Sequence, residues 1–159
     1  MRKIGIISDT HGMMRPEIAA VFAGVELIIH AGDIGGALVM MELKKIAPVS
    51  AVRGNMDKAL WCNELPATDV VTVADVQLYV LHDLAGLYLD PVAAGFAAVI
   101  YGHSHRQTQE TCNGILYFNP GSAGPQRYSL PASVGLITIE NSHIRGEIIP
   151  LPETETKRY

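Results

Sequence analysis

The sequence predicts an α/β fold in which two β-sheets stack face to face and helices cover their outer sides. The N-terminal part alternates strand-like runs with helical segments, the order of parallel βαβ units, and the rest is rich in hairpin signals. The chain has 159 residues, of which 48% are hydrophobic and 18% charged, so it is long and apolar enough to bury a full core. We therefore expect a single domain over residues 1–159.

Three buried strands and two helices are expected in the first half. Pro16 suits the first position of a helix that ends near Gly24, and a second helix opens at Gly35 and runs through Ala47, where Pro48 ends it. The strands between and beside these helices are apolar runs at Ile4–Ser8, Glu26–His30 and Val49–Arg53.

The second half predicts antiparallel hairpins. The turn signals Ala74-Asp75, Asn113-Gly114 and Asn141-Ser142 each separate two strand-like runs. These paired runs are Thr68–Val73 with Val76–Leu81, Gln107–Cys112 with Ile115–Phe118, and Val134–Glu140 with Ile144–Ile149. A short helix around Pro91 to Gly95 precedes a further strand at Ala97–Tyr101, and the tail from Pro150 is expected to fray.

Composition excludes several classes of protein. The net charge is -4 and no run of Lys or Arg occurs, so we expect no dedicated nucleic-acid or anionic-membrane surface. No segment approaches the roughly 20 apolar residues of a membrane-spanning helix, and the N-terminal apolar run is too short for a signal peptide. Cys62 and Cys112 lack C-x-x-C spacing and are expected to be reduced thiols in a cytoplasmic protein. The high apolar content makes a homodimer plausible, because part of it can lie at a subunit interface.

Side chains of metal-ligand type follow five of the predicted strands. The carboxyl ends of parallel strands lie at one edge of a sheet, so we expect these side chains to converge there. Mixed oxygen and nitrogen donors suit borderline divalent cations. There are too many of them for one ion, and they suit two ions bridged by Asp33. The candidates are Asp9, His11, Asp33, Asn55, His82, His103 and His105.

Each candidate also has a simpler explanation. Asp33 could cap the next helix, Asn55 could be a turn residue, and His82 could be a hydrogen-bonded core histidine. The joint pattern decides for metal, because chance would have to put ligand types at all five strand ends. His30 lies outside the pattern and is either a core residue or a support for the ligands, whereas His143 is expected to be solvated.

The ordered motifs resemble those of the calcineurin-like metallophosphoesterase superfamily. They are Asp9-x-His11, Gly32-Asp33, Gly54-Asn55-x-Asp57, His82 and Gly102-His103-x-His105. The short chain, the Gly-Asn-x-Asp form and the loop Asn119-Pro120-Gly121-Ser122 are similar to the small YfcE-type phosphodiesterases. The resemblance implies a four-layer αββα sandwich, with two mixed β-sheets flanked by helices.

The resemblance also implies a site and an activity. Asp9, His11, Asp33 and His105 would hold one ion, and Asp33, Asn55, His82 and His103 the other. The two divalent ions would be manganese first, with iron, nickel or zinc as alternatives. They would hydrolyse small or nucleotide-like phosphodiesters by in-line attack of a hydroxide that bridges them. Catalytic roles fall to Asn55, His82 and His103, and substrate contacts to Arg106 and Asp83.

Two departures from the family pattern bear on the substrate. Met56 stands where many members carry a histidine that assists the leaving group, which favours a modest phosphodiesterase over an efficient monoesterase. Asp83 stands where the family's His-Gly-His has its glycine, and we interpret it first as a surface residue. The alternatives are a phosphomonoesterase or nuclease at the same site, or a protein-binding scaffold similar to the retromer subunit that shares this fold.

Overall fold

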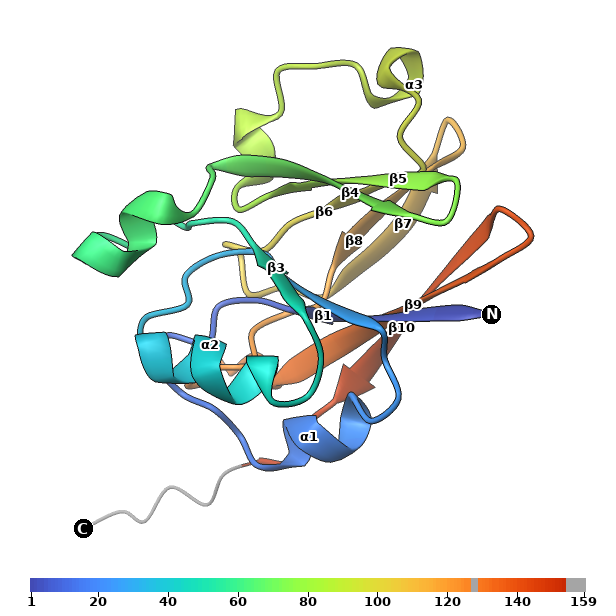
Figure 1. The fold of residues 1–159 in the computed structure, drawn as a ribbon. Helices are drawn as coiled ribbons and strands as arrows, with labels where there is room; N and C mark the ends of the chain where they lie inside the picture. The colour runs from blue at the N-terminus through green and yellow to red at the C-terminus, as the bar shows by residue number, and fades with distance from the viewer. Residues whose placement is uncertain (127–128, 154–159) are drawn as a thin grey trace, which may run out of the picture.

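In the computed structural model, which describes residues 1–126 and 129–153, the strands form two five-stranded sheets that stack face to face (Figure 1). The first sheet has the strand order β10-β9-β1-β2-β3 and the second has the order β4-β5-β6-β8-β7. Both sheets are mixed, because parallel strands at their centres are extended by antiparallel partners. The predicted α/β sandwich is confirmed.

The first sheet contains the N-terminal βαβαβ unit. Strand β1 pairs in parallel with β2, and β2 pairs in parallel with β3. The hairpin β9-β10 adds antiparallel strands on the other side of β1. Helices α1 and α2 cover the outer face (Figure 1). The bounds are β1 Arg2–Ile7, α1 Glu17–Val21, β2 Leu27–His30, α2 Ala37–Lys44, β3 Val49–Ala51, β9 Ser133–Glu140 and β10 His143–Pro150.

The second sheet follows from residue 68 onward. Its strands are β4 Thr68–Val73, β5 Val76–Leu81, β6 Ala98–Ile100, β7 Thr108–Cys112 and β8 Ile115–Asn119. The one-turn helices η2, Leu84–Gly86, and α3, Pro91–Ala94, lie between β5 and β6 in the chain, and a third, η1, spans Leu60–Glu64. Apolar side chains from this connection pack against the second sheet, so the fourth layer is thin.

The main core lies between the two sheets. Alternate residues of each strand point inward, including Ile4, Ile6, Leu78 and Ile100, and all four are fully buried. The ring of Phe118 occupies space that a Cβ at Gly135 or Gly146 would fill. Close packing of this layer fixes the relative position of the two sheets, and therefore of the loops at their edges.

The loops at the two ends of the sandwich differ in kind. The turns of the hairpins β4-β5, β7-β8 and β9-β10 lie at one end, beside the N-terminus of the chain (Figure 1). The segments that follow β1, β2, β3, β5 and β6 lie at the other end and carry the predicted ligands. The convergence expected from parallel strand ends is therefore present.

Element boundaries needed some correction. The two N-terminal helices are shorter than expected, and β3 ends at Ala51 instead of Arg53. The prediction that the tail frays from Pro150 is wrong for its first residues. Pro150 pairs with Ser133, and the amide of the buried Leu151 donates to the carbonyl of Ala132. Residues from 154 onward lie outside the described part of the chain.

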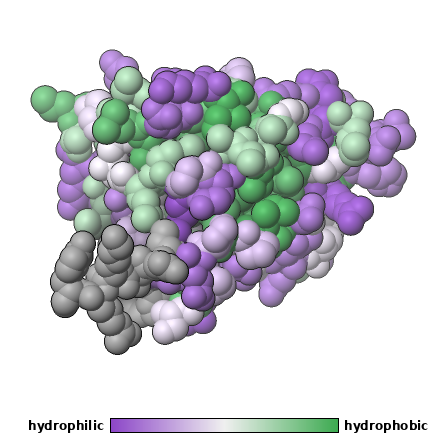
Figure 2. All heavy atoms as spheres, turned by 90° about the horizontal axis from the view of Figure 1, so that it is seen from below, coloured by the Kyte–Doolittle hydropathy of each residue, from purple (hydrophilic) through white to green (hydrophobic). Residues whose placement is uncertain are grey.

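The face covered by α1 and α2 carries a band of apolar atoms bordered by polar ones (Figure 2). Leu38 and Met41 of α2 are 70% and 57% exposed. The expected homodimer stays a prediction. Within residues 1–126 and 129–153, no helix combines the length and the apolar character that crossing a bilayer requires.

Candidate metal centre

The carboxylate of Asp9 presents one oxygen to the protein and the other to a cluster of imidazoles. Oδ2 accepts hydrogen bonds from the Ser8 hydroxyl at 2.7 Å and from the backbone N–H of His103 at 3.0 Å. Oδ1 is buried and accepts no hydrogen bond from any described residue. Because a buried carboxylate oxygen without a donor is costly, this atom needs a cation.

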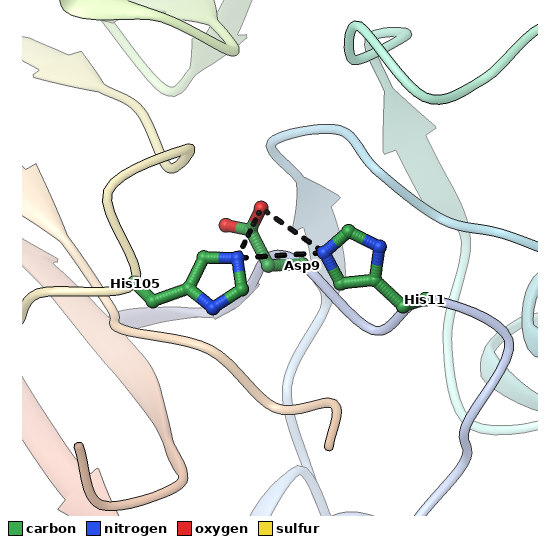
Figure 3. A group of neighbouring side chains, drawn as sticks. All are labelled: Asp9, His11 and His105. Carbon is green, nitrogen blue, oxygen red and sulfur yellow. Dashed lines mark hydrogen bonds and ion pairs between the residues drawn. The ribbon is translucent and has the colours of Figure 1, made fainter. Parts of the chain in front are cut away.

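Three imidazole nitrogens surround that oxygen. His105 Nε2 lies 3.4 Å from Asp9 Oδ1, His11 Nε2 lies 3.8 Å away and His82 Nε2 lies 3.9 Å away. The Nε2 atoms of His11 and His105 also face one another at 3.4 Å (Figure 3). These distances are longer than those of normal hydrogen bonds. Nitrogens that surround one oxygen in this way resemble the ligands around a metal ion.

Asp33 repeats the division seen at Asp9. Its Oδ1 accepts a hydrogen bond from the backbone N–H of Met56 at 2.9 Å, and its Oδ2 lies 3.3 Å from His82 Nε2 and 3.8 Å from His11 Nε2. Burial works against ionisation of Asp33, but the interactions with His82 and with the Met56 N–H outweigh it and lower the pKa of the carboxyl. Asp33 is therefore an anion placed between two imidazoles.

His82 is oriented by its other ring nitrogen. Nδ1 lies 2.7 Å from the carbonyl oxygen of Ala31, which can only accept, so Nδ1 carries the proton and donates. Burial would lower the pKa of His82, but the carboxylates of Asp33 and Asp9 outweigh it and raise that pKa. The Nε2 position between these carboxylates therefore has a high affinity for a cation, either a proton or a metal ion.

Two groups of these residues could each hold a metal ion. Asp9, His11 and His105 form one group, and Asp9, Asp33 and His82 form the other. Within each group the ligand atoms lie within 4.8 Å of one another. Carboxylate oxygens with neutral imidazole nitrogens fit a borderline divalent ion, so the residues present fit the metals that the motifs imply.

Asn55, His103 and Asp83 lie next to the second group. His103 Nδ1 is 3.2 Å from Asn55 Oδ1, and the rings of His82 and His103 pack edge to face with centroids 5.2 Å apart. Asp83 Oδ2 lies 3.7 Å from His103 Nε2, so Asp83 faces a predicted ligand. Its side chain is 50% exposed, which agrees with the interpretation of Asp83 as a surface residue.

A small pocket opens over the cluster. It has a volume of about 160 Å³ and is lined by His11, Asp33, Asn55, Met56, His103, Ser104 and His105. Arg106 is exposed, and it is not among the residues that line this pocket. Its predicted contact with substrate stays a prediction.

Most of the predicted ligands have a left-handed backbone. The φ angle is 55° at Asp9, 45° at His11, 56° at Asp33, 72° at His103 and 60° at His105. This conformation costs a non-glycine residue on the order of 1–2 kcal/mol. Such residues persist only where the surrounding structure holds them, and they concentrate at functional sites.

Several residues that hold the ligand loops were not found from the sequence. Asp57 is buried, and its carboxylate accepts from the backbone N–H groups of Ile34, Gly35 and Gly54, which joins the Asp33 loop to the Asn55 loop. Gly54-Asn55-x-Asp57 was the only signal for it. The side chains of Asn119 and Ser122 were missed because their partners, the carbonyls of Gly102 and Asp9, are distant in sequence.

Comparison with known proteins agrees with this geometry. Residues 2–142 match the profile of the calcineurin-like phosphoesterase superfamily domain. The chain belongs to this superfamily. Its metallophosphoesterase members imply divalent metal ions, and the clusters around Asp9 and Asp33 are candidate ligands for them.

Relatives within the superfamily are named as enzymes. A probable metallophosphoesterase of Methanocaldococcus jannaschii is 32% identical, over 94% of this chain and 82% of the relative. The phosphodiesterase YfcE of Escherichia coli is 28% identical, over 86% of this chain and 88% of the relative. The superfamily member described here is therefore a phosphoesterase by family.

The fold alone is shared more widely. Vps29 of Chaetomium thermophilum superposes with a TM-score of 0.82, covering 98% of this chain and 91% of Vps29, at 17% sequence identity. An identity this low shows a common fold and no more. Membership of the phosphoesterase superfamily rests instead on the sequence match over residues 2–142.

Proposed function

We propose that this protein hydrolyses small phosphodiesters with two divalent metal ions, manganese being the first choice. The observation that carries the proposal is the arrangement of the Asp9 and Asp33 carboxylates. In each of them one oxygen accepts hydrogen bonds from the protein and the other faces histidine nitrogens. Desolvation of two buried carboxylates destabilises the fold unless a cation neutralises them, which supports a metal site at this cluster.

The residues divide into two ligand sets and a pocket wall. Asp9, His11, Asp33 and His105 would hold one ion, and Asp33, Asn55, His82 and His103 the other. The bound ions would supply Lewis acidity toward phosphate oxygens and an activated water nucleophile.

Asn55 and His103 line the pocket, where an amide and an imidazole can stabilise negative charge that develops on the phosphate. Met56 is 61% exposed and also lines this pocket, and it has no proton to give to a leaving group. Its thioether presents an apolar surface there. This supports substrates with good leaving groups, which fits a modest phosphodiesterase better than an efficient monoesterase.

The test is hydrolysis of bis(4-nitrophenyl) phosphate by protein that has first been freed of metal with a chelator. We expect no activity without metal and activity restored by Mn²⁺, with Fe²⁺, Ni²⁺ and Zn²⁺ compared in parallel. Side-by-side rates on 4-nitrophenyl phosphate and a short oligonucleotide distinguish a diesterase from a monoesterase or a nuclease. Inactivity on all three substrates with every metal would refute the proposal.

Two histidines provide a matched control. His105 lies in the ligand cluster, whereas His143 is exposed at the hairpin end of the sandwich. We expect His105→Asn to lower kcat/KM about 100-fold or more, and His143→Asn to leave it within about twofold. Equal effects of the two substitutions would place the chemistry elsewhere.

A further inference from the structure

His30 is a fully buried histidine that belongs to neither ligand set. It is the last residue of β2, and its ring connects two of the loops that carry ligands. Nδ1 lies 3.1 Å from the backbone nitrogen of Gly32, and Nε2 lies 3.0 Å from Thr10 Oγ1. The Thr10 hydroxyl in turn lies 2.8 Å from the carbonyl oxygen of Ile34.

The direction of every hydrogen bond in this chain is determined. The N–H of Gly32 can only donate, so His30 Nδ1 accepts and the ring proton sits on Nε2. The hydroxyl of Thr10 must then accept from Nε2 and use its own proton for the Ile34 carbonyl, which can only accept. Burial, helped by the nearby His82, lowers the pKa of His30 to about 3, so the ring stays neutral and keeps this single tautomer.

Thr10 occupies a position where the backbone needs support. It lies between Asp9 and His11, which have φ angles of 55° and 45°. Backbone hydrogen bonds already join this segment to the next ligand loop, from Asp9 N–H to Gly32 O, from His11 N–H to Asp33 O and from Gly12 N–H to Ile34 O. The side chain of Thr10 is the internal anchor of the same segment, because it binds β2 through His30 and the Asp33 loop through Ile34.

We propose that His30 is a positioning residue that acts through Thr10 to hold the left-handed backbone of Asp9 and His11 in the geometry that binds metal. The inference rests on the proposed function, since it assigns His30 and Thr10 to the support of the metal ligands. Neither residue contacts substrate or metal. Each acts by fixing the angle at which the Asp9 oxygen and the His11 nitrogen enter the cluster.

A residue with a purely structural role would behave differently. It would lower the stability of the metal-free protein when replaced, but the folded fraction would still bind metal with normal affinity. A positioning residue changes the affinity of the folded protein itself. Metal affinity, measured apart from activity, is therefore the deciding quantity.

The experiment is calorimetric titration of Mn²⁺ into metal-free wild type and variants. Thr10→Val keeps the shape of the side chain and removes the hydroxyl, and we expect it to weaken Mn²⁺ binding about 10–100-fold. Thr10→Ser retains the hydroxyl and should stay within about threefold of wild type. Thr138→Val, in β9 where Thr138 pairs with Lys3, is the matched control and should bind Mn²⁺ as wild type does.

His30→Asn tests the other side of the same bond. The Asn oxygen can still accept from Gly32, but the shorter side chain does not reach Thr10, so we expect the same loss of affinity as in Thr10→Val. The double variant should lose no more than either single one, because both remove one interaction. Should Thr10→Val fail to fold, His30→Asn and Thr10→Ser still give the comparison.

The outcomes separate the inference from the function. Wild-type Mn²⁺ affinity in a folded Thr10→Val or His30→Asn would overturn the positioning role and leave the proposed function intact. Fully additive losses in the double variant would overturn it as well. A wild-type protein that binds neither Mn²⁺ nor the other divalent ions would overturn both.

Discussion

The two ends of the sandwich use the same unusual backbone conformation for different reasons. At the hairpin end, positive φ angles occur at Ala74, Asn113, Asn141 and Ser142, all exposed residues in turns. At the site end they occur at Asp9, His11, Asp33, His103 and His105. In a two-residue hairpin the left-handed conformation is the geometry that closes the turn, and water solvates the loop.

At the site end the conformation depends on distant partners. Asp9 is held by the backbone of His103, and the Asp33 loop is held by the carboxylate of Asp57. A long-range hydrogen bond alone does not distinguish the ends, because Ser142 at the hairpin end also donates to the distant Asp75. The comparison teaches that the left-handed residues of the candidate site differ in lying on loops that hydrogen bonds tie to one another. A variant at the site end can therefore be compared with a matched variant at the hairpin end.

The largest difference is expected between two aspartates. Asp33→Ala removes the carboxylate between His82 and His11, and we expect kcat/KM for bis(4-nitrophenyl) phosphate with Mn²⁺ to fall about 1000-fold. Asp75 accepts from the Ser142 hydroxyl at the hairpin end, so Asp75→Ala should leave kcat/KM within about twofold. Steady-state rates and bound manganese are measured together. An active Asp33→Ala protein would show that the cluster is not the site.

Alanine substitutions at two glycines distinguish the effect of a steric clash from the effect of an unfavourable backbone conformation. A Cβ at Gly54 would overlap Asp33 Oδ1, whereas a Cβ at Gly114 would meet no atom within 4 Å. We expect Gly54→Ala to weaken Mn²⁺ binding about tenfold or more, by displacing Asp33. Gly114 has a φ of +78°, so Gly114→Ala should cost about 1 kcal/mol of unfolding free energy and leave Mn²⁺ affinity unchanged. Titration and urea unfolding of both variants give the comparison, and it fails if Gly114→Ala loses metal.

Asp57 is expected to contribute more to stability than an aspartate at a helix terminus. Its carboxylate serves three backbone N–H donors, and Asn has one acceptor oxygen, so Asp57→Asn should lower the unfolding free energy by about 2–3 kcal/mol. Asp90 caps α3 through one oxygen, and Asn is an equally good cap, so Asp90→Asn should change it by less than about 0.5 kcal/mol. Urea unfolding of metal-free protein measures both. Similar losses of unfolding free energy in the two variants would mean that the Asp57 carboxylate does not stabilise the ligand loops more than an ordinary helix cap stabilises its helix.

His30 predicts a pH dependence that no exposed histidine shares. Its pKa is about 3 in the folded protein and 6.5 for the free side chain. Below pH 6.5 His30 is therefore protonated in the unfolded chain but stays neutral in the folded protein. Stability is therefore lost as the pH falls. Between pH 7.5 and 5.5 His30 should account for a loss of about 1.4 kcal/mol.

The measurement is urea unfolding of metal-free wild type and His30→Asn at the two pH values. The variant should lack this part of the loss, whereas His143→Asn at the hairpin end should retain it. If wild type and His30→Asn lose equal stability over this range, the buried ring is not held neutral.

Much of the architecture could be predicted from local patterns. The strand and helix alternation predicted a sheet with parallel strands, and the hairpin signals at Asn113-Gly114 and Asn141-Ser142 predicted turns that the structure contains. The motif residues at the strand ends were found because parallel topology brings strand ends together whatever the details of packing. The helix lengths could not be predicted, nor could the fact that Pro150 and Leu151 are held in place and do not fray. Packing against the first sheet decides both.

The sequence by itself determined which residue types stand at the end of each strand and that these ends share one edge. Only the tertiary structure decided which oxygen of Asp9 and of Asp33 faces the histidines, because the donors that take the other oxygen are Ser8, Met56 and the distant backbone of His103. It also decided that His30 is neutral and points at Thr10, and that buried Arg15 anchors the carbonyls of Ala123 and Gly124. Hydrogen bonds between residues far apart in the chain leave no spacing in the sequence, and they set the orientation of the candidate metal ligands.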